Sequence, residues 1–328
     1  MANANQLKAL VKSHAEGDDT RFYSVALQVA AGAARGGQPH FAQDLRDLID
    51  ELRKSSEQAR TKRGVPVPVA QPRGDLAGLL SVSYPSTRMA DLILDPEVRA
   101  SLDRVVVEQR QHDRLRAQGF RPLRRVLLTG PPGTGKTMSA SALAGELRLP
   151  LFVIRLDGLI TKFMGETAAK LRLVFDALAE THGVYLFDEV DALGGERSRD
   201  NDVGEIRRVL NSFLQFLEQD QSDSLLVAAT NHPQLLDRAM FRRFDAVIDY
   251  PLPTAPIARD VIRNRLATVR LGRIGWAQVD KAAAGLSHGE ITLAAERAAK
   301  DTILADDETV GTSRLVTALN ERHSRTNS

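Results

Sequence analysis

The sequence predicts an α/β protein built on a doubly wound, parallel five-stranded sheet, with a small all-α domain before it and a helical lid domain after it. Two observations support this prediction. Between about residues 75 and 250, short apolar runs alternate with helix-length segments, which is typical of a parallel sheet covered on both faces. After Pro251 and Pro253 the pattern becomes wholly helical.

The five strand candidates are short, and most lack the polar alternation of a strand with one exposed face. They are residues 125–129, 151–155, 184–187, 225–229 and 246–250. The later helical candidates are roughly residues 255–269, 276–284, 288–304 and 312–322. We therefore expect an α/β domain at 75–252 and a compact helical lid at 253–328.

The beginning of the chain has a different character. Three short amphipathic stretches within residues 1–60 have the spacing of helices, and their apolar faces can be buried only against each other. They predict a small helical domain that recruits a substrate or partner, although a structural packing role is equally compatible. Residues 61–74 hold three prolines, two glycines and three basic residues, which predicts a semi-extended linker.

Composition excludes several classes of function. The 328 residues include 44 basic and 42 acidic ones, a balance that gives no reason to expect nucleic acid as a partner. There is no cysteine, which excludes disulfides, thiolate catalysis and cysteine-type zinc sites. No stretch approaches the ~18 apolar residues of a membrane span. We expect a cytoplasmic protein with no membrane association.

One glycine-rich segment carries a nucleotide motif. Residues 130–137, Gly-Pro-Pro-Gly-Thr-Gly-Lys-Thr, fit the pattern G-x-x-x-x-G-K-[ST], directly after an apolar strand and before a helical run. Glycines let backbone N–H groups close around phosphates, and the following helix points its positive end at them. Lys136 is expected to reach the β- and γ-phosphates and Thr137 to ligate Mg²⁺. The full set of expected ATP-binding residues in this loop is Pro132, Gly133, Thr134, Gly135, Lys136, Thr137 and Met138.

A second strand ends in two carboxylates, Asp188 and Glu189. The carboxyl ends of parallel strands meet at one edge of a sheet, so these acids should lie beside the phosphate loop. We expect Asp188 to hold Mg²⁺ and to contribute to the cofactor site, and Glu189 to polarise the attacking water. A plain capping role for either acid is the alternative.

These motifs resemble the AAA+ superfamily, and more narrowly its AAA clade, over roughly residues 75–322. The phosphate loop matches that family's Walker A wording, and Phe-Asp-Glu-Val-Asp at residues 187–191 matches its Walker B. Residues 226–231 resemble the sensor-1 strand, which implies that Asn231 binds the attacking water or the γ-phosphate. Asn231 could instead be an ordinary turn cap.

Residues 236–245 resemble the arginine-finger segment of the same family. The resemblance implies that Arg243, together with Arg242, completes the nucleotide site of a neighbouring subunit. Many relatives carry an arginine where this chain has Met240, and the adjacent arginine pair is similar to the katanin and spastin branch. A surface pair that binds acids of its own subunit is the alternative.

Residues 285–290 resemble the sensor-2 region, where the clade usually has Gly-Ala-Asp and this chain has His288-Gly289-Glu290. The resemblance implies close approach of the Gly289 backbone to the nucleoside. A helix N-cap at Ser287, with Glu290 completing a capping box, is the alternative, and both can hold.

Residues 161–166 resemble pore loop 1, whose aromatic residue grips an extended polypeptide in the centre of a hexameric ring. Phe163 would provide the apolar face, and Lys162 and Met164 flexible stems. A core position for Phe163 is the alternative. Residues 194–202 would form a second, polar pore loop, or an ordinary solvated loop.

The resemblance implies an Mg²⁺-dependent ATPase that remodels, unfolds or translocates protein substrates as a homo-hexamer, with ATP at the subunit interfaces. A different class of function is also compatible with the sequence: a regulatory switch that controls a separately encoded effector, such as a protease or a defence enzyme. A nucleic-acid loader is a third hypothesis, against which the balanced charge counts.

Overall fold

The computed structural model describes residues 74, 76–159, 166–193 and 203–326. The chain divides into two units, Met1–Val69 and Ala70–Ser328, and all described residues belong to the second. The predicted helical domain at 1–60 and nearly all of the predicted linker therefore lie outside the described residues.

A six-stranded sheet in the order β1-β3-β4-β5-β2-β6 forms the centre of this unit. All five predicted strands are present, and every neighbouring pair among them is parallel. Their bounds are β2 Arg125–Thr129, β3 Leu151–Ile154, β4 Val184–Phe187, β5 Leu225–Thr230 and β6 Ala246–Asp249. The predicted fold class is thus confirmed, with one correction to the number of strands.

The correction is β1 (Leu80–Ser83), an edge strand that pairs antiparallel with β3. Its sequence, Leu-Ser-Val-Ser, has a single fully buried residue, and exposure increases along the strand. Such a short, half-polar segment lacks the continuous apolar run that marks the central strands, so the sequence did not predict it.

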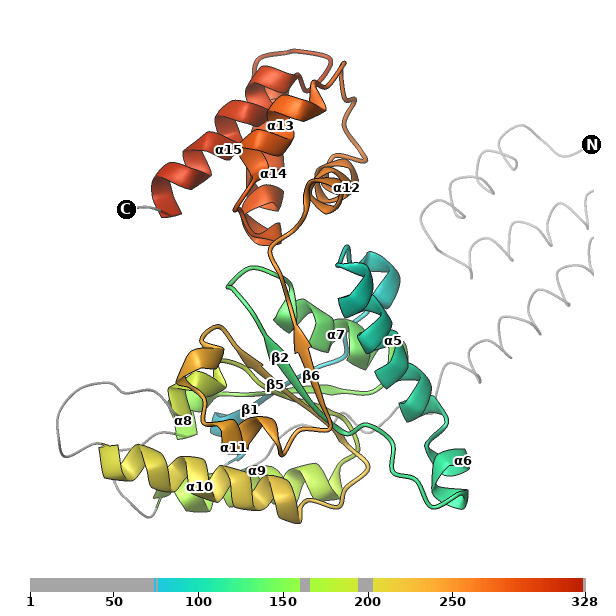
Figure 1. Cartoon of the computed structure of the whole chain (residues 1–328), viewed down its shortest axis with the longest axis vertical. Helices are drawn as coiled ribbons and strands as arrows, with labels where there is room; N and C mark the ends of the chain where they lie inside the picture. The colour runs from blue at the N-terminus through green and yellow to red at the C-terminus, as the bar shows by residue number, and fades with distance from the viewer. Residues whose placement is uncertain (1–73, 75, 160–165, 194–202, 327–328) are drawn as a thin grey trace, which may run out of the picture. The chain divides into compact units, whose positions relative to one another are not determined.

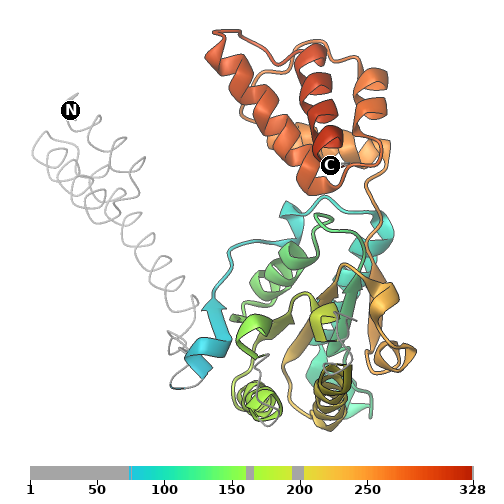
Figure 2. The same cartoon turned by 90° about the vertical axis from the view of Figure 1, so that its left-hand side faces the viewer.

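Helices cover both faces of the sheet (Figures 1 and 2). One face packs against α5 (Pro96–Arg110) and α7 (Lys136–Leu147), and the other against α9 (Glu166–Glu180) and α10 (Val203–Gln219). Every residue of β4 and β5 is buried, which is why these strands are apolar throughout. Shorter helices join the layers: α4 Leu76–Leu79, η1 Met89–Asp91, α6 His112–Ala117, α8 Leu156–Leu159, η2 Val190–Leu193, η3 Pro233–Leu235 and α11 Arg238–Phe241.

The lid consists of α12 (Ala255–Arg265), α13 (Trp276–Ala283), α14 (His288–Leu304) and α15 (Thr312–Thr326), so all four predicted helices are present. They enclose an apolar core of their own. The buried face of α14 is lined by alanines, which lets neighbouring helices approach closely. Among the described residues, no helix combines the length and hydrophobicity that a bilayer crossing requires.

Candidate nucleotide site

The phosphate loop joins β2 to α7, and its shape depends on three glycines with positive φ. These are Gly130 (φ +135°), Gly133 (+75°) and Gly135 (+103°), conformations that L side chains rarely adopt. A Cβ on Gly130 would also lie 2.3 Å from the carbonyl oxygen of Tyr250. The loop therefore wraps tightly around the first residues of α7, whose free N–H groups form an anion-binding end.

Lys136 and Thr137 begin α7 and point back into this loop. Lys136 is 6% exposed, and its Nζ donates to the carbonyl oxygens of Gly130 and Pro131 at 2.7 and 2.8 Å. Burial lowers the pKa of its amine, which Asp188 and two further carboxylates partly counteract. The Thr137 hydroxyl donates to Asp188 Oδ2 at 2.8 Å, which joins the phosphate loop to the end of β4.

These groups fit a magnesium nucleotide chemically. Mg²⁺ prefers oxygen ligands and is usually held by one or two side chains together with phosphates. The Thr137 hydroxyl and the Asp188 carboxylate form such a pair. Across the described ranges, no group of three or more His, Cys, Asp or Glu side chains could hold a metal ion.

The strand order brings the remaining polar groups to the same edge. Because β5 lies between β4 and β2, Asn231, directly after β5, is placed between Glu189 and the phosphate loop. Glu189 is exposed with φ +55°, a strained backbone that is uncommon outside glycine and often occurs at functional sites. The site thus combines the carboxylate of Glu189, the amide of Asn231 and the phosphate loop with its cationic Lys136.

Asp191 is a residue whose role sequence reasoning missed. The Thr230 hydroxyl donates to Asp191 Oδ1 at 2.7 Å, and the His232 N–H donates to the Thr230 oxygen at 3.0 Å. These bonds tie the loop that holds Asn231 to the turn that follows Glu189. Asp191 is the fifth residue of the Phe-Asp-Glu-Val-Asp motif, but the sequence does not predict that its hydrogen-bond partner is Thr230.

The lid contacts the phosphate loop directly. The Gly289 N–H donates to the Gly133 carbonyl oxygen at 2.9 Å. Ser287 caps α14 in a reciprocal capping box with Glu290, so the capping interpretation of this segment is confirmed. Contact of Gly289 with a nucleotide stays a prediction.

A pocket of about 280 Å³ adjoins this contact and extends from the phosphate loop between the two halves of the unit. Its walls come from four separate segments, which is why no sequence motif marks it. Apolar and polar residues share the lining about equally; it comprises Asp91, Leu92, Ile93, Leu94, Thr134, Gly135, Met138, Val261, Asn264, Arg265, His288 and Thr292. Its position beside the loop and its composition suit a nucleoside.

Comparison with known proteins agrees with this geometry. The profile described as "ATPase family associated with various cellular activities (AAA)" matches residues 126–252. An "Uncharacterized AAA family ATPase y4kL" of Sinorhizobium fredii is 31% identical over 304 residues, which cover 93% of this chain and 90% of that protein. The chain belongs to the AAA family of ATPases.

Other AAA relatives match a smaller part of this chain. The "ATP-dependent zinc metalloprotease FtsH 1" of Symbiobacterium thermophilum is 32% identical over 253 residues, which cover 74% of this chain and 42% of that protein. This chain therefore spans less than half the length of that relative. The solved structure of the FIGL-1 AAA domain superimposes with a TM-score of 0.59 at 25% identity, and the match covers 74% of this chain and 85% of that one.

The two arginines of this AAA chain's finger-like segment differ in their surroundings. Arg243 Nε lies 2.7 Å from Glu218 Oε1, and Nη1 donates to the Ala239 carbonyl at 2.7 Å. The Nε–H does not point at that oxygen, so the contact is an ion pair without a hydrogen bond. Arg242 is exposed, and no ion pair joins it to another described residue. Met240 is completely buried, so that position belongs to the core.

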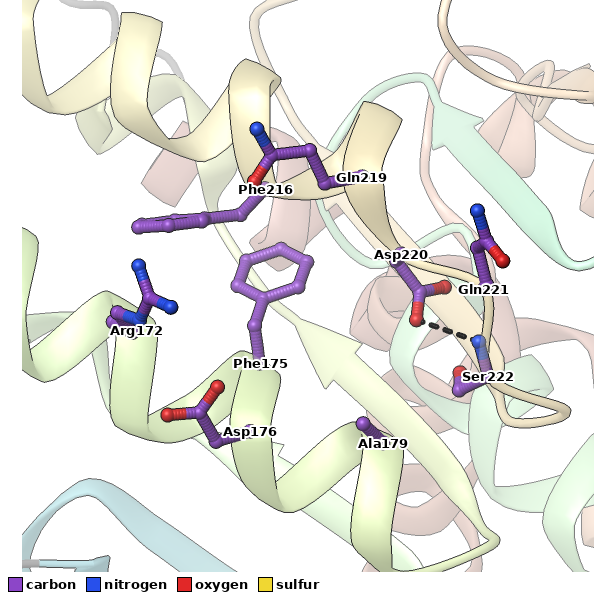
Figure 3. A pocket seen from close by; sticks show the side chains of 9 residues that line it. All are labelled: Arg172, Phe175, Asp176, Ala179, Phe216, Gln219, Asp220, Gln221 and Ser222. Atoms are coloured by element: carbon purple, nitrogen blue, oxygen red, sulfur yellow. Dashed lines mark hydrogen bonds between the residues drawn. The ribbon is translucent and has the colours of Figure 1, made fainter.

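The predicted pore residues Lys162, Phe163 and Met164 lie outside the described residues, as does the predicted second pore loop at 194–202. Their roles stay predictions. A further hollow of about 430 Å³ lies between the carboxyl ends of α9 and α10, where the rings of Phe175 and Phe216 lie 5.5 Å apart, centre to centre, and are tilted by 38° (Figure 3). Both helices end just before strands begin, so this hollow is at the sheet edge opposite the phosphate loop.

Proposed function

We propose that this AAA ATPase uses Mg²⁺-dependent ATP hydrolysis to remodel, unfold or translocate protein substrates, and that it works as a homo-hexamer. The observation that carries the hydrolytic part is the joining of Thr137 to Asp188 at 2.8 Å, with Glu189 and Asn231 following strands at the same edge. A protein substrate is supported by the similarity to FtsH relatives named as ATP-dependent metalloproteases.

In this proposal each polar group has one role. Thr137 and Asp188 hold Mg²⁺, which would offset the negative charge of the phosphates. Lys136 exchanges its two loop carbonyl partners for phosphate oxygens. Glu189 orients the attacking water and accepts its proton, and Asn231 holds that water in line.

The arginine pair supports a site that is completed by a second copy of the chain. Arg242 is exposed and forms no ion pair with another described residue, whereas Arg243 is held by Glu218 within its own subunit. Arg242→Ala should therefore suppress ATP turnover without lowering the midpoint of thermal unfolding. Arg243→Ala should lower both. Equal turnover in Arg242→Ala and wild type would contradict a role for Arg242 at the interface.

The protein-remodelling step is tested by Phe163→Ala, with unfolding of a fluorescent model substrate as the measurement. We expect ATP binding to be retained and substrate unfolding to be lost. Phe120→Ala is the matched control, because Phe120 is 66% exposed and lies in the segment that leads into β2, at the sheet edge away from the phosphate loop. Substrate unfolding that survives Phe163→Ala unchanged would contradict the pore-grip role.

The regulatory-switch hypothesis predicts a different outcome in one further experiment. A Glu189→Gln variant held in ATP should retain its protein partner during affinity capture. Capture of many unfolded chains supports a remodeller, whereas stable capture of one partner in stoichiometric amount supports a switch.

A further inference from the structure

The imidazole of His288 is an unexplained polar group in the wall of the 280 Å³ pocket. Both ring nitrogens, Nδ1 and Nε2, are buried, and neither has a hydrogen-bond partner among the described residues. Burying a polar atom without a hydrogen-bond partner is costly, so each such atom requires an explanation. A ligand in the pocket would supply one.

The pocket's charged side chains, in contrast, are already engaged. Asp91 Oδ2 accepts from the Arg88 N–H at 2.7 Å. Arg265 forms an ion pair with Glu296 at 2.7 Å. Neither side chain needs a ligand to satisfy it, whereas His288 does.

The position of His288 within the pocket is set by its two neighbours. Ser287 Oγ lies 2.6 Å from the place where a Cβ on Gly133 would be, and Gly289 bonds to the Gly133 carbonyl. His288 is therefore at the phosphate-loop end of the pocket. In a nucleotide bound through its phosphates, the part of the nucleoside that comes first after the phosphates is the sugar.

We propose that His288 hydrogen-bonds a ribose hydroxyl of the bound nucleotide and selects ribonucleotides over deoxyribonucleotides. This inference rests on the proposed nucleotide site and adds a specificity residue to it. A hydroxyl both donates and accepts, so it can pair with either nitrogen of a neutral imidazole. The apolar wall of Leu92, Met138 and Val261 is left for the base.

Burial lowers the pKa of His288, which keeps its ring neutral at neutral pH. A neutral ring has one N–H and one free lone pair, which matches the donor and acceptor capacity of a sugar hydroxyl. The clade's usual glycine at this position has no side chain that could make this bond, so the selection would be a property of this chain.

The test is equilibrium binding of ADP, 2′-deoxy-ADP, 3′-deoxy-ADP and inosine diphosphate to the full chain. Diphosphates avoid turnover during the measurement. In the wild type we expect at least one deoxy-ADP to bind about five- to tenfold more weakly than ADP, the value of one net hydrogen bond. His288→Phe should remove that difference by weakening ADP alone. Leu293→Phe, at an exposed position of the same helix, is the matched control and should preserve it.

Each outcome decides the inference. Loss of the ADP preference in His288→Phe supports it. Equal wild-type affinity for ADP and both deoxy forms overturns it without any need for a folded variant. If His288→Phe instead removes discrimination against inosine diphosphate, His288 contacts the base and the sugar assignment is wrong. A wild-type chain that binds none of these diphosphates contradicts the proposed function itself.

Discussion

Gly133→Ala tests the contact between the phosphate loop and the lid most sharply. Gly133 has φ +75°, and placing an L side chain in this left-handed region costs roughly 1–2 kcal/mol. The new Cβ would also lie 2.6 Å from Ser287 Oγ, closer than real contacts allow. The hydroxyl must then turn away, which removes the N-cap of α14 at a cost of about 1 kcal/mol.

Together these effects predict a loss of roughly 2–3 kcal/mol of stability. For a unit of this size, that corresponds to a decrease of roughly 4–12 °C in the midpoint of thermal unfolding. Nucleotide affinity should fall as well, because α14, which would lose its cap, forms one wall of the pocket.

Substitutions at two other glycines separate the cost of backbone strain from the cost of the clash with Ser287. Gly119 has φ +82°, but a Cβ added there would have nothing within 4 Å, so Gly119→Ala should show the backbone strain alone. Gly78 lies in α4 without positive φ and also with nothing within 4 Å. Gly78→Ala should therefore be neutral or stabilising by up to ~1 kcal/mol.

The costs of substituting Gly133 and Ser287 should also be coupled, because both changes act on the same cap. Ser287→Ala should cost about 1 kcal/mol in the wild type but much less in a Gly133→Ala background, where the cap is already lost. Thermal melts of the four proteins measure this cycle. Strictly additive costs, or a Gly133→Ala variant no less stable than Gly119→Ala, would refute the clash.

Two further predictions concern ion pairs. Arg124→Met should destabilise the chain by about 3–5 kcal/mol, because Asp220, whose side chain is 3% exposed, would lose its ion-pair partner. Denaturant melts measure this free energy, and a loss below ~1 kcal/mol would contradict the prediction. The hydrogen bond from Arg259 lowers the pKa of Asp280 in the folded chain. The pair therefore contributes its full stabilisation of the lid at pH values above the ordinary carboxyl pKa of ~3.9. This stabilisation is lost as the pH falls through the lowered pKa that Asp280 has in the folded chain. Arg259→Gln should therefore weaken the dependence of lid stability on pH in acid. Fluorescence of Trp276, the single tryptophan, reports it, and an unchanged acid transition would count against the pair.

Much of the fold could be predicted because its signals are local. The central strands are continuous apolar runs, since helices bury both of their faces, and the glycine pattern at 130–137 identifies the loop that needs positive φ. Parallel-sheet topology then places Asp188 and Asn231 near that loop without any knowledge of the side chains.

Features that depend on tertiary contacts could not be predicted. The edge strand β1 is recognised only by its pairing with β3, and the ion pair of Arg243 with Glu218 joins the turn after α11 to helix α10. The pocket is assembled from four segments, so the unsatisfied ring of His288 becomes apparent only when the lid lies against the phosphate loop. The sequence showed that His288 departs from the family pattern but did not show what the histidine faces.

ATP turnover by Glu189→Gln, measured beside ATP binding on the same preparation, tests the hydrolytic site most directly. The change preserves the shape of the side chain and removes the carboxylate that we propose accepts the water's proton. We predict ATP binding within about twofold of wild type and turnover reduced by ~100-fold or more. Turnover at the wild-type rate would contradict the assignment of Glu189 as the base.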